Sequence, residues 1–90
     1  MSLEKTLKER GGRYGNFADH ARVAMGIKDF IRGELQVRNK VLAVDQQQAL
    51  DTIADKIARI VNGDPDYPDN WHDIAGYATL VDRRLTLGRK

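Results

Sequence analysis

The segment at residues 45–62 constrains the fold most, because its apolar residues recur with the period of an α-helix. Asp51, Asp55, Arg59 and Asn62 fall on the side opposite the apolar stripe, which comprises Leu50, Ile53, Ala54, Ile57, Ile60 and Val61. This spacing is typical of an amphipathic helix with one face in a core. Asp45 followed by Gln48 resembles a capping box, and Gly63 is a suitable residue to end the helix. We therefore expect a helix over residues 45–62.

Two other segments predict helices of similar length. Residues 16–35 begin with Asn16, a favourable N-cap, and continue with apolar residues at helical spacing. Residues 70–86 follow the turn "DPDYPDN", and Asp69 or Asn70 can cap them. The main stripe of this last helix comprises Trp71, Ile74, Ala75, Ala78, Val81 and Leu85, with Tyr77 and Leu80 on its flank. Residues 36–44 fit either a helix tail or a connecting loop.

The first fifteen residues predict a short helix followed by a break. Residues 1–10 are charged, with Leu3 and Leu7 as a thin apolar face, and Gly11, Gly12 and Gly15 then favour a glycine-rich hinge over residues 11–15. No alternating strand pattern occurs. The predicted fold is therefore all-α and a single domain over residues 1–90: a compact bundle of three main helices plus a short N-terminal helix.

Size and composition limit how such a bundle can be stabilised and what it can bind. The chain has 90 residues and no cysteine, so helix packing or homo-oligomerisation must stabilise it. No apolar run is long enough to span a membrane, which predicts a cytoplasmic protein without a membrane partner. Residues 1–40 carry nine Lys/Arg against five Asp/Glu (+4), and residues 41–90 carry six against eight (−2). This basic front half suits phosphate or acidic partners, but it is too weakly charged for duplex DNA.

The stretch "KERGGRYGNF" leaves two interpretations open. Glycine-rich backbone ahead of a helix can expose N–H groups to an anion, with Arg13 adding charge and Tyr14 an aromatic surface. However, the stretch lacks the phosphate-loop pattern, and no strand precedes it. The alternative is a plain hinge between two helices.

Carboxylates on the two downstream helices form a candidate metal site. Asp51 and Asp55 lie one turn apart and, with Asp73, could hold Mg²⁺ through water. The alternative is a solvated face on which Asp55 pairs with Arg59. The two histidines are isolated in sequence, so they do not indicate a zinc site.

Three motifs together resemble a known group of proteins. "YGNF", then "KIARI", then "DNWHDIAGY" are similar to a small uncharacterised helical family of phages and prophages, over residues 8–85. That family is in turn distantly similar to the all-α nucleotide pyrophosphatases of the MazG type, which hold Mg²⁺ with helix-borne carboxylates. Here the third helix offers Asp51 and Asp55 without a glutamate, and the last offers Asp73 alone.

The resemblance implies a shared role for residues that the motifs place in several segments. The candidate ligand-binding residues are Arg13, Tyr14, Lys56, Arg59, Trp71, Asp73 and Tyr77; the same charged groups could instead form an internal ion network. The first hypothesis is a phage accessory protein in the host cytoplasm that binds a phosphorylated, nucleotide-like ligand as an oligomer. The second is a Mg²⁺-dependent pyrophosphohydrolase using Asp51, Asp55 and Asp73. The third is a protein-interaction module acting on a host factor.

Overall fold

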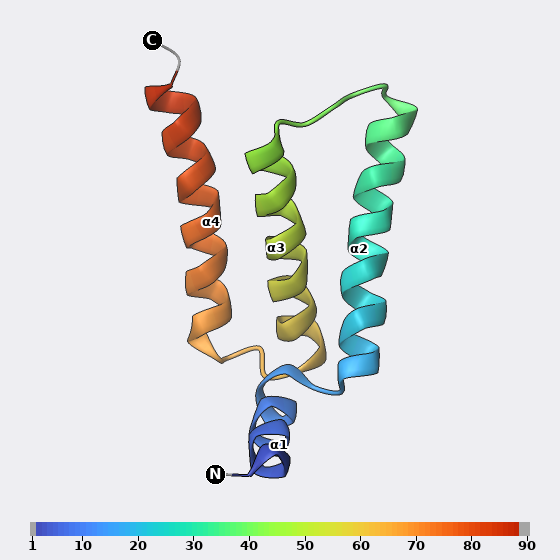
Figure 1. Ribbon diagram of the computed structural model, residues 1–90, viewed down its shortest axis with the longest axis vertical. Helices are drawn as coiled ribbons and strands as arrows, with labels where there is room; N and C mark the ends of the chain where they lie inside the picture. The colour runs from blue at the N-terminus through green and yellow to red at the C-terminus, as the bar shows by residue number, and fades with distance from the viewer. Residues whose placement is uncertain (1, 89–90) are drawn as a thin grey trace.

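The computed structural model describes residues 2–88, which form four helices and no strand. The helices are α1 (Leu3–Tyr14), α2 (Phe17–Val37), α3 (Val44–Asn62) and α4 (Pro68–Leu87). The prediction of an all-α fold with three main helices and a short N-terminal one is therefore confirmed (Figure 1). None of these helices combines the length and apolarity needed to cross a membrane.

The three long helices pack side by side in one layer. In Figure 1, α3 lies between α2 and α4, and α1 projects from the end of the layer where α2 begins. Within residues 2–88, α3 contacts α2, α4 and α1, whereas α2 and α4 do not touch each other. The molecule measures 49 × 30 × 22 Å. Because the layer is one helix thick, both of its broad faces are open.

The glycine-rich hinge predicted over residues 11–15 is wrong in extent. Helix α1 continues through Gly11 and Gly12 and ends at Tyr14, and the Gly15 N–H donates to the Gly11 carbonyl at 2.8 Å. A glycine costs a helix only about 1 kcal/mol relative to alanine, which the docking of the helix end on α3 can offset. The joint is reduced to Gly15 and Asn16, and Gly15 has φ +81°, a conformation that favours glycine.

Helix starts differ from the sequence predictions in two of three cases. Asn16 caps α2 as predicted, accepting from the N–H groups of Ala18 and Asp19. Helix α3 begins at Val44 without the predicted Asp45–Gln48 box; instead, the side chain of Gln46 accepts from the Ala43 N–H at 2.9 Å. Helix α4 begins two residues early, at Pro68. Proline fits the first turn because the N–H it lacks has no intrahelical partner there.

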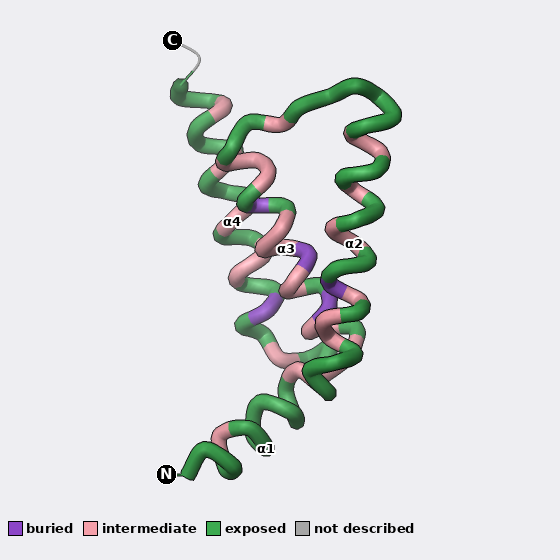
Figure 2. Tube along the Cα trace, turned by 45° about the vertical axis from the view of Figure 1, so that its right-hand side comes forward, coloured by how far each residue is buried: buried purple, intermediate pink, exposed green. Residues whose placement is uncertain are grey.

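The buried core is small and made of small side chains. Among residues 2–88, the buried residues are Ala24, Ala49, Ala54, Ala58 and Asn70 (Figure 2). Three of the four buried alanines belong to α3, the central helix, and small side chains there let its neighbours approach closely. Large apolar side chains are left outside: Trp71, placed by its periodicity in the core stripe of α4, is 56% exposed. Helix α1 docks at the end of this layer where α2 begins (Figure 1).

Candidate functional site

Hydrogen bonds to backbone carbonyls hold the joint between α1 and α2 against the end of α3. The side-chain amide of Asn62 donates to the carbonyls of Tyr14 and Asn16, at 3.2 and 2.9 Å. The Asp64 N–H donates to the Arg13 carbonyl at 2.8 Å. A Cβ on Gly63 would lie 2.2 Å from that carbonyl oxygen, so only glycine permits this approach. Gly63 follows α3 as predicted, but its role is the close contact rather than a left-handed cap, since its φ is −116°.

Tyr14 is the centre of an aromatic and cationic cluster at this joint. The Arg59 guanidinium lies 4.4 Å from the Tyr14 ring centroid and that of Arg10 lies 5.2 Å from it. The Tyr67 ring meets Tyr14 edge-on, with centroids 6.2 Å apart, and Arg13 lies 5.4 Å from the Tyr67 centroid. Cation–π contacts of this kind hold a guanidinium in place while leaving its edge N–H groups free to donate.

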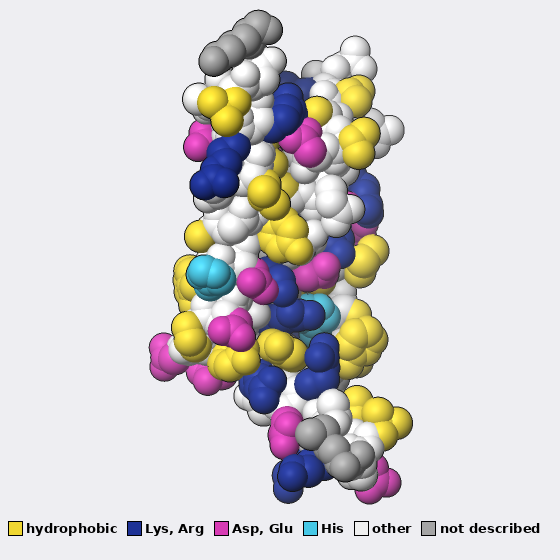
Figure 3. Space-filling view, turned by 60° about the vertical axis from the view of Figure 1, so that its left-hand side comes forward, with side chains coloured by type: hydrophobic (Ala, Val, Ile, Leu, Met, Phe, Trp, Pro, Cys, Tyr) yellow, Lys and Arg dark blue, Asp and Glu magenta, His cyan; other side chains and the backbone are white. Residues whose placement is uncertain are grey.

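A pocket of about 360 Å³ opens beside this cluster, where α1, the start of α2 and the end of α3 converge. It is lined by two arginines, a histidine and apolar or neutral groups: Leu7, Arg10, Gly11, Tyr14, Gly15, Asn16, Phe17, His20 and Arg59. No carboxylate lines it. Figure 3 shows Lys and Arg side chains gathered where α1 meets the layer. The pocket therefore presents positive charge that no acidic lining residue offsets.

His20 lies partly buried in the wall of the pocket. Burial lowers its pKa below 6.5, the neighbouring charges of Arg59 and Lys28 lower it further, and Asp55 opposes them. The imidazole is therefore neutral at pH 7. Its Nδ1 is buried without a hydrogen-bond partner among the described residues. The Phe17 ring stacks on it, with centroids 6.1 Å apart.

The structure brings some predicted site residues together and separates others. Tyr14 and Arg59 share the pocket, and Arg13 lies next to it on Tyr67. Lys56 instead pairs with Asp73 at 3.0 Å, which matches the predicted ion-network alternative for these two residues and lowers the pKa of Asp73.

The remaining two predicted ligand-binding residues lie elsewhere. The indole N–H of Trp71 donates to the Pro65 carbonyl at 2.8 Å. Tyr77 lines a separate open hollow on α4, together with His72, Asp73 and Leu80. That hollow shares no lining residue with the pocket at Tyr14.

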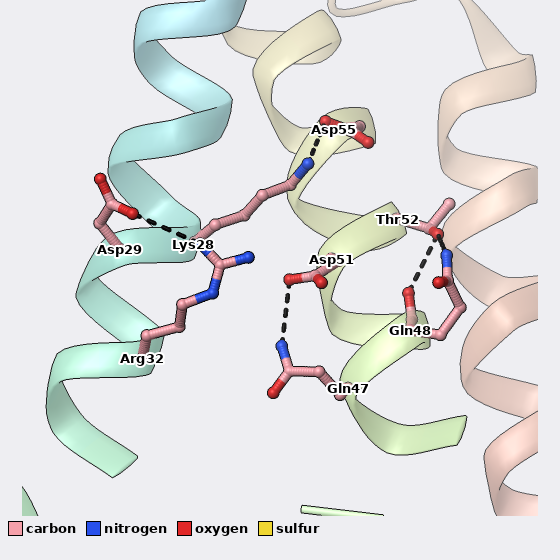
Figure 4. Close-up of polar contacts among 8 residues, drawn as sticks. All are labelled: Lys28, Asp29, Arg32, Gln47, Gln48, Asp51, Thr52 and Asp55. Atoms are coloured by element: carbon pink, nitrogen blue, oxygen red, sulfur yellow. Dashed lines mark hydrogen bonds and ion pairs between the residues drawn. The ribbon is translucent and has the colours of Figure 1, made fainter. Parts of the chain in front are cut away.

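The three carboxylates proposed for Mg²⁺ have separate partners. Asp51 accepts from the Gln47 side chain at 3.1 Å, and Asp55 pairs with Lys28 of α2 at 2.9 Å rather than with Arg59 (Figure 4). Asp73 is held by Lys56 on the side of α3 that meets α4. No group of three or more Asp, Glu or His side chains within residues 2–88 is arranged to hold a metal ion. The arrangement therefore does not favour the Asp51, Asp55 and Asp73 set.

Sequence reasoning missed Arg10, His20 and Tyr67 as members of the site. Arg10 and Tyr14 are four residues apart, so they face the same way on a helix. The predicted N-terminal helix ends at residue 10, so the sequence prediction did not place Arg10 and Tyr14 on one helix. Tyr67 lies in a turn that carries no periodic signal, and its contact with Tyr14 depends on the tertiary fold.

Comparisons with known proteins identify no relative: no protein-family model, no curated protein and no solved structure matches this chain.

Proposed function

We propose that this protein binds a phosphorylated, nucleotide-like ligand in the pocket between α1, α2 and α3. The observation that carries the proposal is the pair of arginines, Arg10 and Arg59, flanking Tyr14 in a pocket lined by no carboxylate. The proposed setting, drawn from the resemblance to phage and prophage proteins, is that of a phage accessory protein in the host cytoplasm.

The charges of these arginines are available to a ligand. Lys28, Lys56 and Arg84 each pair with a carboxylate of a neighbouring helix. Within residues 2–88, neither Arg10 nor Arg59 has such a partner. A guanidinium matches phosphate oxygens with two parallel N–H donors, and such charge-assisted bonds are stronger than neutral ones. A phosphate group would therefore find two unpaired guanidinium groups at this pocket.

Base contact would come from Phe17 rather than from the Tyr14 ring. Tyr14 is occupied by the guanidinium groups and acts by orienting them. Phe17 is 80% exposed on the pocket rim and stacks on His20. An exposed aromatic ring beside an anion site suits a base, since stacking contributes about 1–3 kcal/mol per base.

Isothermal titration calorimetry with ATP, inorganic pyrophosphate and adenosine tests the proposal. We expect ATP and pyrophosphate to bind and adenosine not to. Arg59→Gln should weaken both phosphorylated ligands at least about tenfold, because a hydrogen bond to a charged group contributes about 1.5–3 kcal/mol. Phe17→Ala should weaken ATP but not pyrophosphate.

The matched control is Arg83→Gln on α4, which changes the net charge equally but lies outside the pocket. It should bind like the wild type. No heat with either phosphorylated ligand would refute the proposal. Equal weakening by Arg83→Gln and Arg59→Gln would also refute it, since that result would indicate only a general charge effect.

A further inference from the structure

Helix α3 carries a row of apolar side chains that the other elements of the described chain cover only in part. Leu50, Ile57 and Val61 are 37, 36 and 68% exposed. They are spaced by seven and four residues, so they lie on one side of the helix. Gln46 and Ile53 fall on the same side by the same spacing, and this row contains no charged residue.

Three charged residues of α3 point in other directions. Asp55 faces α2 through Lys28, Lys56 faces α4 through Asp73, and Arg59 contacts Tyr14. Arg59 is two positions from both Ile57 and Val61, which places it about 200° around the helix from each. The apolar face therefore lies on the side of the layer opposite the ligand pocket.

Both neighbouring helices place an apolar residue on the same side of the layer. Residues two positions apart on a helix point in nearly opposite directions, so a residue two positions from an ion-pair partner on the pocket side lies on the side of the apolar row. On α4, Trp71 is two positions from Asp73, the partner of Lys56. On α2, Phe30 is two positions from Lys28, the partner of Asp55. Trp71 is 56% and Phe30 70% exposed. These side chains, with Leu50, Ile57 and Val61, form what we name the apolar face.

We propose that a second copy of this chain packs against the apolar face in a two-fold symmetric dimer. Within residues 2–88, only four alanines and one asparagine are buried, which is a small core for a folded domain. Covering the apolar face would convert the layer into a two-layer structure with large side chains at its centre.

The size and charge of the face suit this occupant. Helices of about 20 residues are about 30 Å long and pack about 9 Å apart, so the whole side of the layer that carries the apolar face measures roughly 800 Å². A standard interface buries about 800 Å² per partner. In a two-fold dimer the same patch meets itself, and the uncharged row of α3 brings no like charges together at its centre.

Analytical ultracentrifugation tests the dimer with paired variants. The wild type should sediment at twice the chain mass of 10.2 kDa. Val61→Lys should raise the dimer dissociation constant at least about tenfold. The matched control is Leu80→Lys, which adds the same charge at a 62% exposed position. Leu80 is seven positions from Asp73, so it lies on the opposite side of the layer and should leave the dimer intact.

A second measurement covers variants that lose their fold on dissociation. The thermal midpoint of a folded dimer rises with protein concentration, whereas that of a monomer does not. We expect this rise for the wild type and for Leu80→Lys. A wild-type chain that stays at 10.2 kDa at high concentration, with a constant thermal midpoint, would overturn the proposal. A monomeric chain that binds a different protein at the apolar face would also overturn it. Equal dissociation of Val61→Lys and Leu80→Lys would overturn it as well.

Discussion

Gly63→Ala is the sharpest perturbation of the joint that places Tyr14 beside Arg59. A Cβ at this position would lie 2.2 Å from the Arg13 carbonyl oxygen and 2.5 Å from the Tyr14 Cα. Both atoms are backbone, so no side chain can rotate away. The φ of Gly63 is −116°, so this glycine is not in the left-handed region that favours glycine. The substitution places a methyl group directly against the backbone at the end of α1.

The expected loss of stability follows from the steric overlap between the new Cβ and the backbone of Arg13 and Tyr14. Over-packing of this kind costs about 1–3 kcal/mol. For a domain of this size, 1 kcal/mol shifts Tm by about 4–8 °C, so we expect a fall of at least about 4 °C. The bond from the Asp64 N–H to the Arg13 carbonyl would lengthen with the displacement of α1.

The assay is thermal unfolding followed by circular dichroism at fixed protein concentration, with Gly76→Ala as the control. Gly76 lies inside α4, and a Cβ there would meet nothing within 4 Å. Alanine should therefore stabilise α4 by about 1 kcal/mol and raise Tm. Opposite signs for the two glycines are the expected result. A Gly63→Ala protein at least as stable as the wild type would refute the tight joint.

Two further perturbations probe the same region. Asn62→Ala removes the side-chain bonds to the Tyr14 and Asn16 carbonyls and should reduce stability by about 1–2 kcal/mol in denaturant unfolding; no loss would contradict their role. His20 has a pKa below 6.5 in the folded state, so the unfolded chain binds the proton more readily. Its contribution to stability should be constant above about pH 6.5 and fall as pH drops through 6.5 toward the folded pKa. His20→Gln should flatten this decline in unfolding measured between pH 5 and 8, and an unchanged slope would contradict the shift.

Local patterns predicted the elements of this fold well, because amphipathic spacing and polar caps act within one helix. Asn16 caps α2 as its side chain suggests, and the helix over residues 45–62 appears within one residue of its expected start. The continuation of α1 through Gly11 and Gly12 could not be predicted in this way. Helix propensity measures a local penalty, whereas the end of α1 is held by contacts with residues 62–64.

The apolar stripes identify the side of each helix that is apolar, but they do not show which part of that side a neighbouring helix covers. In α3, Ala54 is buried, while Ile57 and Val61 of the same predicted stripe are exposed. A helix with two neighbours in a flat layer has two seams and two open faces, and periodicity alone does not distinguish a seam from a face. The shared position of Tyr14 and Arg59 likewise depends on how α1 docks, which no single segment encodes.

The most direct test of the ligand pocket is an NMR titration of the ¹⁵N-labelled protein with ATP. We expect the largest amide shifts at Gly11, Gly15 and Asn16, which line the pocket, together with a shift of the Arg59 side-chain Nε–H. Shifts confined to Gly76 and Tyr77 in the hollow of α4, or no saturable shifts at all, would contradict a phosphate site built on Arg10 and Arg59.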